Sequence, residues 1–490
     1  MKEYGAYING EWRLNLKSRE CVLKSPIDSK EIASIKLGEK EEIEEAIDSA
    51  YNAFYNSPLW KDISVYERAE LLNKVANLLE EKVEEIAKIE TLNTGKIFKE
   101  AVEDVLNSAK IFRYYGGIAG SIGGNTYNLE KDVHAMTIRE PIGVCAVIVP
   151  WNYPLSIAVN AIAPALVSGN TVLVKPPSIA PLSIIKLFEI FDEVKLPKGV
   201  VNLILGSGSK IGDILGETSK IDKIVFTGST ETGKNLMKQS SNTLKKLSLE
   251  LGGKSPLIVF NDCDQELALD YAILGGLLNQ GQLCVASSRI LVQSSIIAEF
   301  IDKLKLKLKN IRIGNPFLEE IQMGPLISKE HTDTVIDYIK SADSEGAQII
   351  YGGSRLEGDR YNSACYVEPT LILIGNPKHE LVKNEIFGPV IIIQPFEDEK
   401  EAIKLANCTK YGLAAGVFTK DISRALRISK DIISGQIWIN TYLQSYLDIP
   451  VEPQKESGQG VLMGLEGLKA FTKIKTVVLN LCPKKTGWID

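Results

Sequence analysis

The sequence predicts an α/β protein built on two doubly wound parallel sheets. The chain has 490 residues, enough for two or three domains of ordinary size. Hydrophobic residues make up 44% of it and charged residues 24%, which is typical of a globular protein with a large core. From residue 142 onward, short β-branched runs alternate with helical segments. This alternation indicates βαβ units, whose helices cover both faces of a mostly parallel sheet.

The first elements are helices. Residues 39–118 contain ERAELLNKVANLLEEKVEEIAKIE, where apolar residues recur three and four apart and the interspersed Lys and Glu indicate solvated helix faces. The glycine-rich stretch GGIAGSIGGNTYN then breaks the helical pattern near residues 116–128. The strands that follow are GVCAVIVP, NTVLVKP, GVVNLIL and KIVFTG, with helices near 156–168, 181–194, 209–218 and 231–241.

A second alternating block follows the first. Its strands are SPLIVF, SSRILV, QIIYGG, VIIIQPF, AAGVFT and GQIWIN, with helices between them. We therefore expect one α/β domain that ends near residue 252 and a second that runs to about residue 456.

Charge and rare residue types exclude several classes of protein. The net charge of −6 leaves no basic surplus for binding nucleic acid. The N-terminal MKEYGAYINGEWR has no apolar run typical of a signal peptide, and no stretch is long and apolar enough to predict a membrane span. Seven scattered cysteines without a C-x-x-C motif favour the cytoplasm over a disulfide framework or a zinc site. With three histidines, we expect no metal site and a carboxylate as catalytic base.

Two glycine-rich turns follow predicted strands and open predicted helices. FTGSTETGKN, residues 226–235, matches the nucleotide-binding P-loop except that Asn235 replaces the Ser or Thr that binds magnesium. A nucleoside triphosphatase is therefore a weaker alternative. Gly228 and Ser229 still lie where backbone amides at a helix N-terminus can bind a phosphate. LGSGSKIG, residues 205–212, is one residue too long for the usual dinucleotide motif.

Three polar side chains lie beside glycines or strand ends. Cys284 follows a glycine in NQGQLCVASSR, Glu250 ends a strand in ELGGKSP, and Asn152 follows a strand in VPWNYP. Each has an ordinary structural interpretation: a buried cysteine, a surface carboxylate and a turn asparagine. Together with the doubly wound sheets, however, they indicate a catalytic site.

The chain resembles the NAD(P)-dependent aldehyde dehydrogenases over nearly its whole length. The motifs that carry this resemblance are PWNYP (150–154), VLVKPPS (172–178), FTGST (226–230), LELGGKSP (249–256), GQLC (281–284), MGPLIS (323–328) and EIFGPV (385–390). The resemblance implies a cofactor domain, a catalytic domain and a small β arm used in oligomerisation.

The resemblance also implies a reaction, the oxidation of an aldehyde to its carboxylic acid. Cys284 is expected to attack the aldehyde carbon, because a thiolate is a strong nucleophile. The side-chain amide of Asn152 and the backbone N–H of Cys284 are expected to stabilise the oxyanion. Hydride transfer to the nicotinamide would leave a thioester, and Glu250 is expected to activate the water that hydrolyses it.

The resemblance assigns the cofactor, NAD or NADP, to residues along the strand ends. The implied contacts are Lys175 with the adenosine ribose, Gly208 with the adenine side, Gly228 and Ser229 with the pyrophosphate, Glu385 with the nicotinamide ribose, Phe387 with the nicotinamide and Trp151 at the cleft border. Ser178 stands where NAD-preferring members often have a glutamate. Because a carboxylate would repel a 2′-phosphate and a serine can donate to it, we expect NADP to be accepted.

The expected substrate is a neutral aliphatic or hydroxylated aldehyde. The residues that match pocket-lining positions are Tyr153, Ser156, Asn160, Leu278, Leu283, Val285, Leu443 and Ser445. Asn160 replaces the aromatic residue of betaine-aldehyde members and the arginine of several semialdehyde members. A quaternary ammonium group would thus lose cation–π support and a carboxylate would lose its clamp. A semialdehyde or aminoaldehyde dehydrogenase remains the alternative.

Two further departures from the family concern proton transfer and the pocket mouth. Ala161 and Leu462 stand where many members have a lysine and a glutamate thought to relay protons, so any relay here must differ or be aqueous. Glu452-Pro453 replaces a Gly-Gly pair, which must change the backbone near the substrate mouth and subunit contacts.

The resemblance sets the domain limits and the assembly. We expect a dinucleotide-binding domain made by residues 1–119 and 142–252 and a catalytic domain made by residues 253–456. Residues 120–141 and 457–490 are expected to form the oligomerisation arm and the C-terminal segment. A cytoplasmic homodimer or homotetramer is expected. A non-catalytic relative is disfavoured by retention of the catalytic side chains, and an enzyme that passes the thioester to coenzyme A is disfavoured by Glu250.

Overall fold

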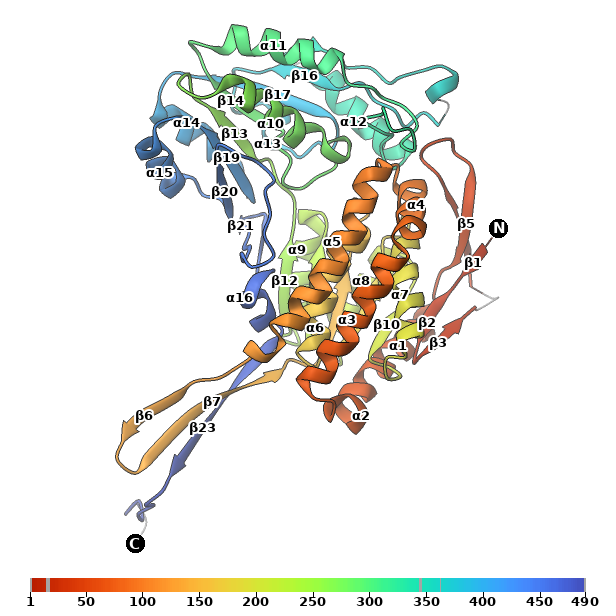
Figure 1. Ribbon diagram of the computed structural model, residues 1–490, viewed down its shortest axis with the longest axis vertical. Helices are drawn as coiled ribbons and strands as arrows, with labels where there is room; N and C mark the ends of the chain where they lie inside the picture. The colour runs from red at the N-terminus through yellow and green to blue at the C-terminus, as the bar shows by residue number, and fades with distance from the viewer. Residues whose placement is uncertain (1, 15–17, 343–345, 362, 489–490) are drawn as a thin grey trace.

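The computed structural model describes residues 2–14, 18–342, 346–361 and 363–488. Within these residues, two large sheets form the centres of two α/β domains, and a long three-stranded arm projects away from both (Figure 1). The predicted fold class is confirmed.

The first large sheet has a parallel centre and antiparallel edges. In the described chain its order is β22-β12-β11-β8-β9-β10-β2-β3. The parallel strands are β8 (Val144–Ile148), β9 (Thr171–Lys175), β10 (Val201–Leu203), β11 (Lys223–Thr227) and β12 (Lys246–Glu250). The antiparallel edges are β2 (Ala6–Ile8), β3 (Glu11–Arg13) and β22 (Gly458–Gln459). The connecting helices are α6 (Pro154–Val167), α7 (Leu182–Val194), α8 (Gly208–Glu217) and α9 (Thr230–Ser240), as predicted.

Helices cover both faces of this sheet. On one face, α2 (Pro58–Lys61), α3 (Val65–Glu81), α4 (Val83–Thr94) and α5 (Phe98–Gly117) share a core with α6 and α7, and on the other face α1 (Lys40–Tyr51) and the π-helical turn η1 (Asn52–Asn56) share a core with α8. These helices agree with the helical pattern predicted over 39–118. Ser64 caps α3 and forms a capping box with Glu67, while α4 ends at Gly95, whose φ is +79°. Before them lies a small sheet of β1 (Lys2–Tyr4), β5 (Glu31–Lys36) and β4 (Glu20–Lys24), which the sequence pattern did not indicate.

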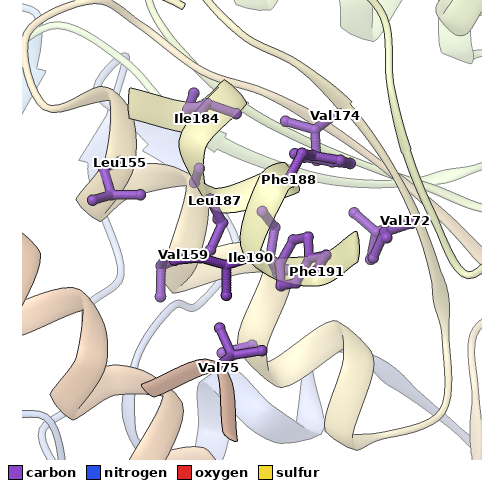
Figure 2. Close-up of a cluster of buried hydrophobic side chains, with 14 of the residues drawn as sticks. Val75, Leu155, Val159, Val172, Val174, Ile184, Leu187, Phe188, Ile190 and Phe191 are labelled. Atoms are coloured by element: carbon purple, nitrogen blue, oxygen red, sulfur yellow. The ribbon is translucent and has the colours of Figure 1, made fainter. Parts of the chain in front are cut away.

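The main hydrophobic core lies between this sheet and its helices. Figure 2 shows Phe188 and Phe191 of α7 beside Val172 of β9, with Val159 of α6 and Val75 of α3 completing the cluster. All five side chains are at most 1% exposed. This packing fixes α6, whose N-terminal end carries the residues after Asn152 toward the candidate site.

The second large sheet is parallel except for one edge strand. In the described residues its order is β15-β16-β17-β14-β13-β19-β20. The strands are β13 (Pro256–Val259), β14 (Arg289–Gln293), β15 (Gln348–Tyr351), β16 (Thr370–Leu373), β17 (Val390–Phe396), β19 (Ala414–Phe418) and β20 (Gln436–Ile439), and β16 was not predicted. The helices around it are α10 (Gln265–Leu277), α11 (Ile297–Lys309), α12 (Lys329–Ser341), α13 (Glu380–Lys383), α14 (Glu399–Ala406) and α15 (Ile422–Asp431).

The change from one sheet to the other falls where the sequence suggested. β12 ends at Glu250 in the first sheet, and β13 begins at Pro256 in the second. The domain boundary near residue 252 stays a prediction, which this change of sheet supports.

The arm joins segments far apart in the sequence. β7 (Val133–Pro141) pairs along its whole length with β23 (Thr472–Asn480), and β6 (Thr126–Glu130) lies on its other side. The predicted segment 457–490 combined the arm with the C-terminal residues, and its residues 489–490 lie outside the described chain. Its start adds β22 to the edge of the first sheet, and α16 (Gly464–Lys469) follows before the arm strand. No helix in the described chain is long and apolar enough to cross a membrane.

Candidate active site

The carboxyl edge of the first sheet gathers the predicted side chains. Ile148 of β8 is in register with Lys175 of β9, and Thr227 of β11 is in register with Glu250 of β12. Asn152 follows β8 in the turn that leads into α6. Parallel strands end at a common edge, which is where ligands bind in open α/β sheets. The strand order therefore brings these residues to one side of the domain.

Cys284 reaches this edge on a tightly wound loop from the second domain. Asn279, Gln280 and Gly281 all have left-handed φ values, of 49°, 59° and 71°. A Cβ on Gly281 would lie 2.2 Å from the carbonyl oxygen of Gly388, so the chain can pass there only as glycine. Such a costly run of conformations persists when the surroundings fix it, and it is frequent at functional sites.

Asn152 is held against the same loop. Its Nδ2 donates to the carbonyl oxygen of Gln282 at 3.0 Å, and Asn279 Nδ2 donates to the carbonyl oxygen of Asn152 at 3.0 Å. The side chain is buried, and its Oδ1 has no hydrogen-bond partner among the described residues. An amide nitrogen carries two hydrogens, so one remains for a further acceptor beside Cys284.

Cys284, Asn152 and Glu250 line one cavity of about 790 Å³. A cavity of this size accommodates a small organic molecule. The predicted pocket residues on its wall are Tyr153, Ser156, Asn160, Leu283, Val285, Leu443 and Ser445. Leu278 is not among the lining residues. It lies half-buried in the short 3₁₀ turn before Cys284, and its role in the pocket stays a prediction.

Two ionisable groups of this cavity, Glu250 and Cys284, are neutral at rest. Burial raises the pKa of the Glu250 carboxyl to about 8, and its Oε1 has no hydrogen-bond partner in the described part of the chain. Burial, and then the nearby Glu385 and Glu250, raise the pKa of the Cys284 thiol to about 12. Near pH 7 both groups therefore hold their protons. The thiol needs a base before it can act as a nucleophile.

The walls around Glu250 are apolar where many family members carry charges. Ala161 of α6 and Leu462 both line the same cavity as Glu250. These two positions, which are far apart in the sequence, thus line one cavity. Neither side chain can accept or donate a proton, so proton exchange with Glu250 must pass through water or other residues.

A buried ionic cluster behind Tyr153 was missed by the sequence analysis. Lys96 is fully buried and donates to Glu90 at 3.2 Å and to Asp104, which also lines the cavity. Its Nζ lies 3.7 Å from the centroid of the Tyr153 ring. The interspersed Lys and Glu residues of this stretch were predicted to lie on solvated helix faces. Glu90 is 1% exposed, so that prediction was wrong at Glu90.

The adenosine end of the predicted cofactor site centres on a buried lysine. Burial lowers the pKa of Lys175 to about 8, and no carboxylate pairs with it in the residues that the structure describes. Its Nζ donates to Ser178 Oγ at 3.5 Å, and Ser178 Oγ donates to the carbonyl oxygen of Gly206 at 2.7 Å. A Cβ on Gly208 would lie 3.6 Å from the lysine nitrogen. An uncompensated cation beside a bare glycine suits a ribose or phosphate.

The next turn offers a helix N-terminus without a P-loop. Ser229 caps α9 by accepting from Thr232 N, and a Cβ on Gly228 would lie 2.5 Å from the ring of Phe226. Lys234 forms an ion pair with Glu456 at 2.9 Å on the surface rather than turning toward the strand ends. Lys234 is therefore not placed to bind a triphosphate, which disfavours the triphosphatase alternative. The backbone amides at Gly228 and Ser229 can still bind a pyrophosphate.

The nicotinamide end is marked by a carboxylate and an aromatic cluster. Glu385 Oε1 accepts from Gly253 N at 2.9 Å, and burial raises the pKa of its carboxyl to about 7. Trp151 and Phe387 pack edge to face, with ring centroids 5.3 Å apart. His331, which the sequence analysis missed, packs on Trp151 and lies 2.7 Å from the carbonyl oxygen of Phe387. A lone histidine after MGPLIS gave no signal of this contact.

The predicted cofactor residues thus offer groups that suit a dinucleotide. They comprise a buried cation without a carboxylate partner in the described chain, a helix N-terminus, and the Glu385 carboxyl, whose charge helps to raise the pKa of Cys284. The described residues contain no group of three or more His, Cys, Asp or Glu side chains suited to a metal ion.

Comparisons with known proteins agree with this geometry. A model of the aldehyde dehydrogenase family matches residues 12–477. The chain is 40% identical over 485 residues to betaine aldehyde dehydrogenase of Bacillus subtilis, covering 99% of both chains. It is 39% identical to aldehyde dehydrogenase 1A1 of Rattus norvegicus, covering 98% of this chain and 95% of that one. A crystal structure of betaine aldehyde dehydrogenase from Staphylococcus aureus with NAD+ superposes with a TM-score of 0.97 at 39% identity, covering 99% of this chain and 96% of that one.

Proposed function

The chain belongs to the aldehyde dehydrogenase family and oxidises aldehydes to carboxylic acids, and on this premise we propose how its own residues carry the reaction. Cys284 is the nucleophile, Asn152 is an oxyanion donor and Glu250 is the general base. The observation that supports this assignment best is the convergence of the three side chains, from two domains, on one cavity.

The first step is attack on the aldehyde. The proton of the Cys284 thiol leaves to solvent through cavity water, and the sulfur adds to the carbonyl carbon to form a thiohemiacetal. The free N–H of Asn152 and the backbone N–H of Cys284 stabilise the oxygen as negative charge develops on it. A bound nicotinamide dinucleotide supplies the hydride acceptor that converts this adduct into a thioester.

The second step is hydrolysis of the thioester. Glu250 removes a proton from a water molecule in the cavity, and the hydroxide adds to the thioester carbon. The C–S bond then breaks, the carboxylic acid leaves and Cys284 is regenerated. Because the Glu250 carboxyl has a pKa of about 8, it is a competent base only in its ionised fraction, so hydrolysis quickens as the pH rises toward that value.

We propose NAD+ as cofactor, with NADP+ also accepted. The relative from Staphylococcus aureus binds NAD+, and the residues that fit a dinucleotide are present here. Acceptance of the 2′-phosphate is supported by Lys175, a buried cation without a carboxylate partner in the described chain, beside Ser178. Measured turnover with NADP+ should fall sharply in Ser178→Glu while turnover with NAD+ persists. A wild-type enzyme without NADP+ turnover would contradict this assignment.

We propose a neutral aliphatic or hydroxylated aldehyde as substrate. The cavity wall is largely apolar, from Leu283, Val285 and Leu443 among others. Asn160 also lines it, and its Oδ1 is buried without a partner among the described residues, so it can accept a hydrogen bond from a substrate hydroxyl. Lys96 compensates the charge of Asp104 on the same wall.

A cationic aldehyde is the second candidate. Glu103 and Asp104 both line the cavity, as do the rings of Tyr153 and Trp438, and carboxylates and aromatic faces attract cations. The relative from Bacillus subtilis is named for betaine aldehyde, but the relative named aldehyde dehydrogenase 1A1 is almost as similar. The names of the relatives therefore do not separate the two candidates.

A panel of aldehydes, each assayed with NAD+ and with NADP+, decides between them. We expect propanal and 2-hydroxypropanal to give higher kcat/KM values than betaine aldehyde, 4-aminobutanal or succinate semialdehyde. A kcat/KM for betaine aldehyde or 4-aminobutanal far above those of the neutral aldehydes would establish the second candidate instead. Activity with none of the panel would contradict both.

We also propose a cytoplasmic homodimer or homotetramer that assembles through the arm. Apolar side chains on the arm are exposed, among them Leu129 at 67% and Val478 at 64%, and such exposure marks association surfaces. Cysteines 21, 145, 263, 284, 365, 408 and 482 are all free thiols, in keeping with a reducing compartment. Light scattering on the intact protein measures the oligomeric state.

A further inference from the structure

A second cavity, of about 380 Å³, lies where the arm joins the first domain. Its walls come from the π-helical turn and α2, from Arg68 of α3, from the residues after α6, and from the arm strands β7 and β23. None of its described lining residues lines the catalytic cavity. It is therefore a separate site, with no part in the chemistry derived above.

The charge of this cavity is opposite to that of the whole chain. Lys61, Arg68, Lys473 and Lys475 line it with one carboxylate, Glu140, which leaves a surplus of three positive charges among its described lining residues. The chain as a whole has a net charge of −6. The hydrogen bond from Lys475, and then the charges of that lysine, of Lys473 and of Lys61, lower the pKa of Glu140. One carboxylate thus neutralises one of four cations.

Arg68 is a fixed donor in the wall of this cavity. Its Nε donates to the carbonyl oxygen of Val167 at 3.0 Å and its Nη1 to the carbonyl oxygen of Ile63, while the guanidinium lies over the ring of Trp60. No carboxylate pairs with it in the described chain, and its Nη2 donates to no protein atom there. A Cβ on Gly169, whose φ is +92°, would lie 3.4 Å from the guanidinium carbon. The half-buried cation is held in place by neutral groups and kept accessible by a glycine.

The opposite wall of the cavity is aromatic, and its backbone forms a π-helical turn. Phe54 and Tyr55 lie in the π-helical turn Asn52–Asn56, and π-turns are frequent at functional sites. The Tyr55 hydroxyl donates to Asp222 Oδ1 at 2.9 Å, which orients the ring, yet the residue remains 44% exposed. A fixed, exposed aromatic face beside clustered cations matches a ligand with a ring and a phosphate.

We propose that this cavity binds a small phosphomonoester that carries a ring, of the class of a nucleoside monophosphate or a sugar phosphate. The phosphate is held by Arg68, Lys61 and Lys473, because planar guanidinium and ammonium donors suit phosphate oxygens. The ring lies against Phe54 and Tyr55. The volume of about 380 Å³ falls within the range usual for small-molecule sites.

Isothermal titration calorimetry on the full-length enzyme saturated with NAD+ tests this proposal. Saturation blocks the dinucleotide site, which would otherwise bind phosphates too. The probes are AMP, ribose 5-phosphate and inorganic phosphate. Tighter binding of AMP would indicate a nucleoside monophosphate as ligand, and tighter binding of ribose 5-phosphate would indicate a sugar phosphate. We expect saturable binding to the wild type, weakened at least about tenfold in the double variant Lys61→Glu, Lys473→Glu, because a cation-to-anion exchange converts attraction into repulsion.

The matched control is Lys74→Glu, an exposed lysine of α3 that does not line the cavity. We expect its affinity to stay within about twofold of the wild type, since exposed charges at a distance are screened. If the double variant does not fold, the salt dependence of wild-type binding decides, and a clear loss of affinity between low and high salt supports the site. No saturable binding of any probe, as would follow if a second copy of the chain covers the cavity, or equal weakening by Lys74→Glu, overturns the proposal.

Discussion

Two buried carboxyl groups of the catalytic cavity have different surroundings. Glu250 stands at a strand end among apolar residues, and its Oε1 lacks a partner in the described chain. Asp104, on α5, forms an ion pair with Lys96, which also binds Glu90. Burial lowers the pKa of Lys96, but the attraction of Asp104 and Glu90 outweighs it, so the net shift is upward. Both acids line one cavity, and burial raises the pKa of both, to about 8 for Glu250 but only to about 6 for Asp104, whose shift the charge of Lys96 opposes.

The difference distinguishes a catalytic group, Glu250, from the ion-paired groups Asp104, Lys96 and Glu90, which stabilise the cavity wall. An uncompensated buried carboxyl has its pKa displaced toward the working pH, which is what a general base needs. A compensated buried pair keeps its charges and depends on both partners, so removing one partner leaves an unpaired charge in the interior. We expect mutations at Glu250 to change rate without loss of stability, and mutations at Lys96 to do the reverse.

The largest effect is expected for Glu250→Gln. Loss of the base should slow thioester hydrolysis by about 10²–10⁴-fold, measured by single-turnover release of the acid. The raised pKa of the Glu250 carboxyl means that the folded state binds this proton more tightly than the unfolded state. That contribution is fully present below the ordinary carboxyl pKa and is lost as the pH rises through about 8.

The stability of this variant sharpens the comparison. Above pH 8, Glu250→Gln should unfold at a temperature equal to or higher than the wild type, because glutamine cannot ionise. The exposed Glu81→Gln, on α3, serves as the control and should change neither rate nor stability. A marked loss of stability in Glu250→Gln would mean that Glu250, too, has a structural role in the folded state.

Lys96→Met should give the opposite result. Without the ammonium group, Glu90 and Asp104 face each other unpaired, and we expect a loss of about 3–5 kcal/mol of unfolding free energy in urea titrations. Lys99→Met on the exposed face of α5 should cost no more than about 0.5 kcal/mol. A Lys96→Met enzyme as stable as the wild type would show that the ion pairs of Lys96 do not stabilise the fold, in contradiction to the structural role inferred for them.

Asn152→Ala should lower kcat/KM by about 10²–10³-fold, because one oxyanion donor is lost. The isosteric Asn152→Asp keeps the volume but not the N–H donors, so it should lose activity to a similar extent. If Asn152→Asp kept wild-type activity, neither N–H of Asn152 would be needed, including the one that donates to the Gln282 carbonyl, and the oxyanion role would be excluded.

The smallest effect is expected for Ala161→Lys. This change introduces a cation into the cavity that Glu250 shares, and a nearby opposite charge should lower the pKa of that carboxyl. The midpoint of the pH profile for thioester hydrolysis should therefore move down from about 8 by about one unit. Ala161→Met adds similar length without charge and should leave the midpoint in place.

The sequence predicted the parts of the site that depend on local pattern. Asn152, Lys175 and Glu250 follow or end β-branched runs, and parallel strands bring such positions to one edge. Gly228 and Ser229 were recognisable from turn chemistry at a helix start, whereas the cofactor roles of Gly208 and Lys175 came from the family resemblance. The pairing of the two arm segments came from the family resemblance, since strands so far apart in the sequence carry no local signal of each other.

The sequence could not predict what depends on packing between distant elements. Glu90 and Lys96 lie in a stretch whose charges are typical of a solvated surface, and only the packing of α4, α5 and α6 buries them. His331 meets Trp151 through the contact of two domains, which no spacing encodes. β16 escaped notice because a four-residue apolar run cannot be told from a buried loop by its period.

The most direct test of the account is the trapping of the acyl group on Glu250→Gln. The variant is mixed with propanal and NAD+, quenched in acid and digested, and the peptide that contains Cys284 is examined by mass spectrometry. We expect a propanoyl adduct on Cys284 in this variant, and none when Cys284 is also replaced by alanine. Full turnover by Glu250→Gln without any adduct, or an adduct on another residue, would contradict it.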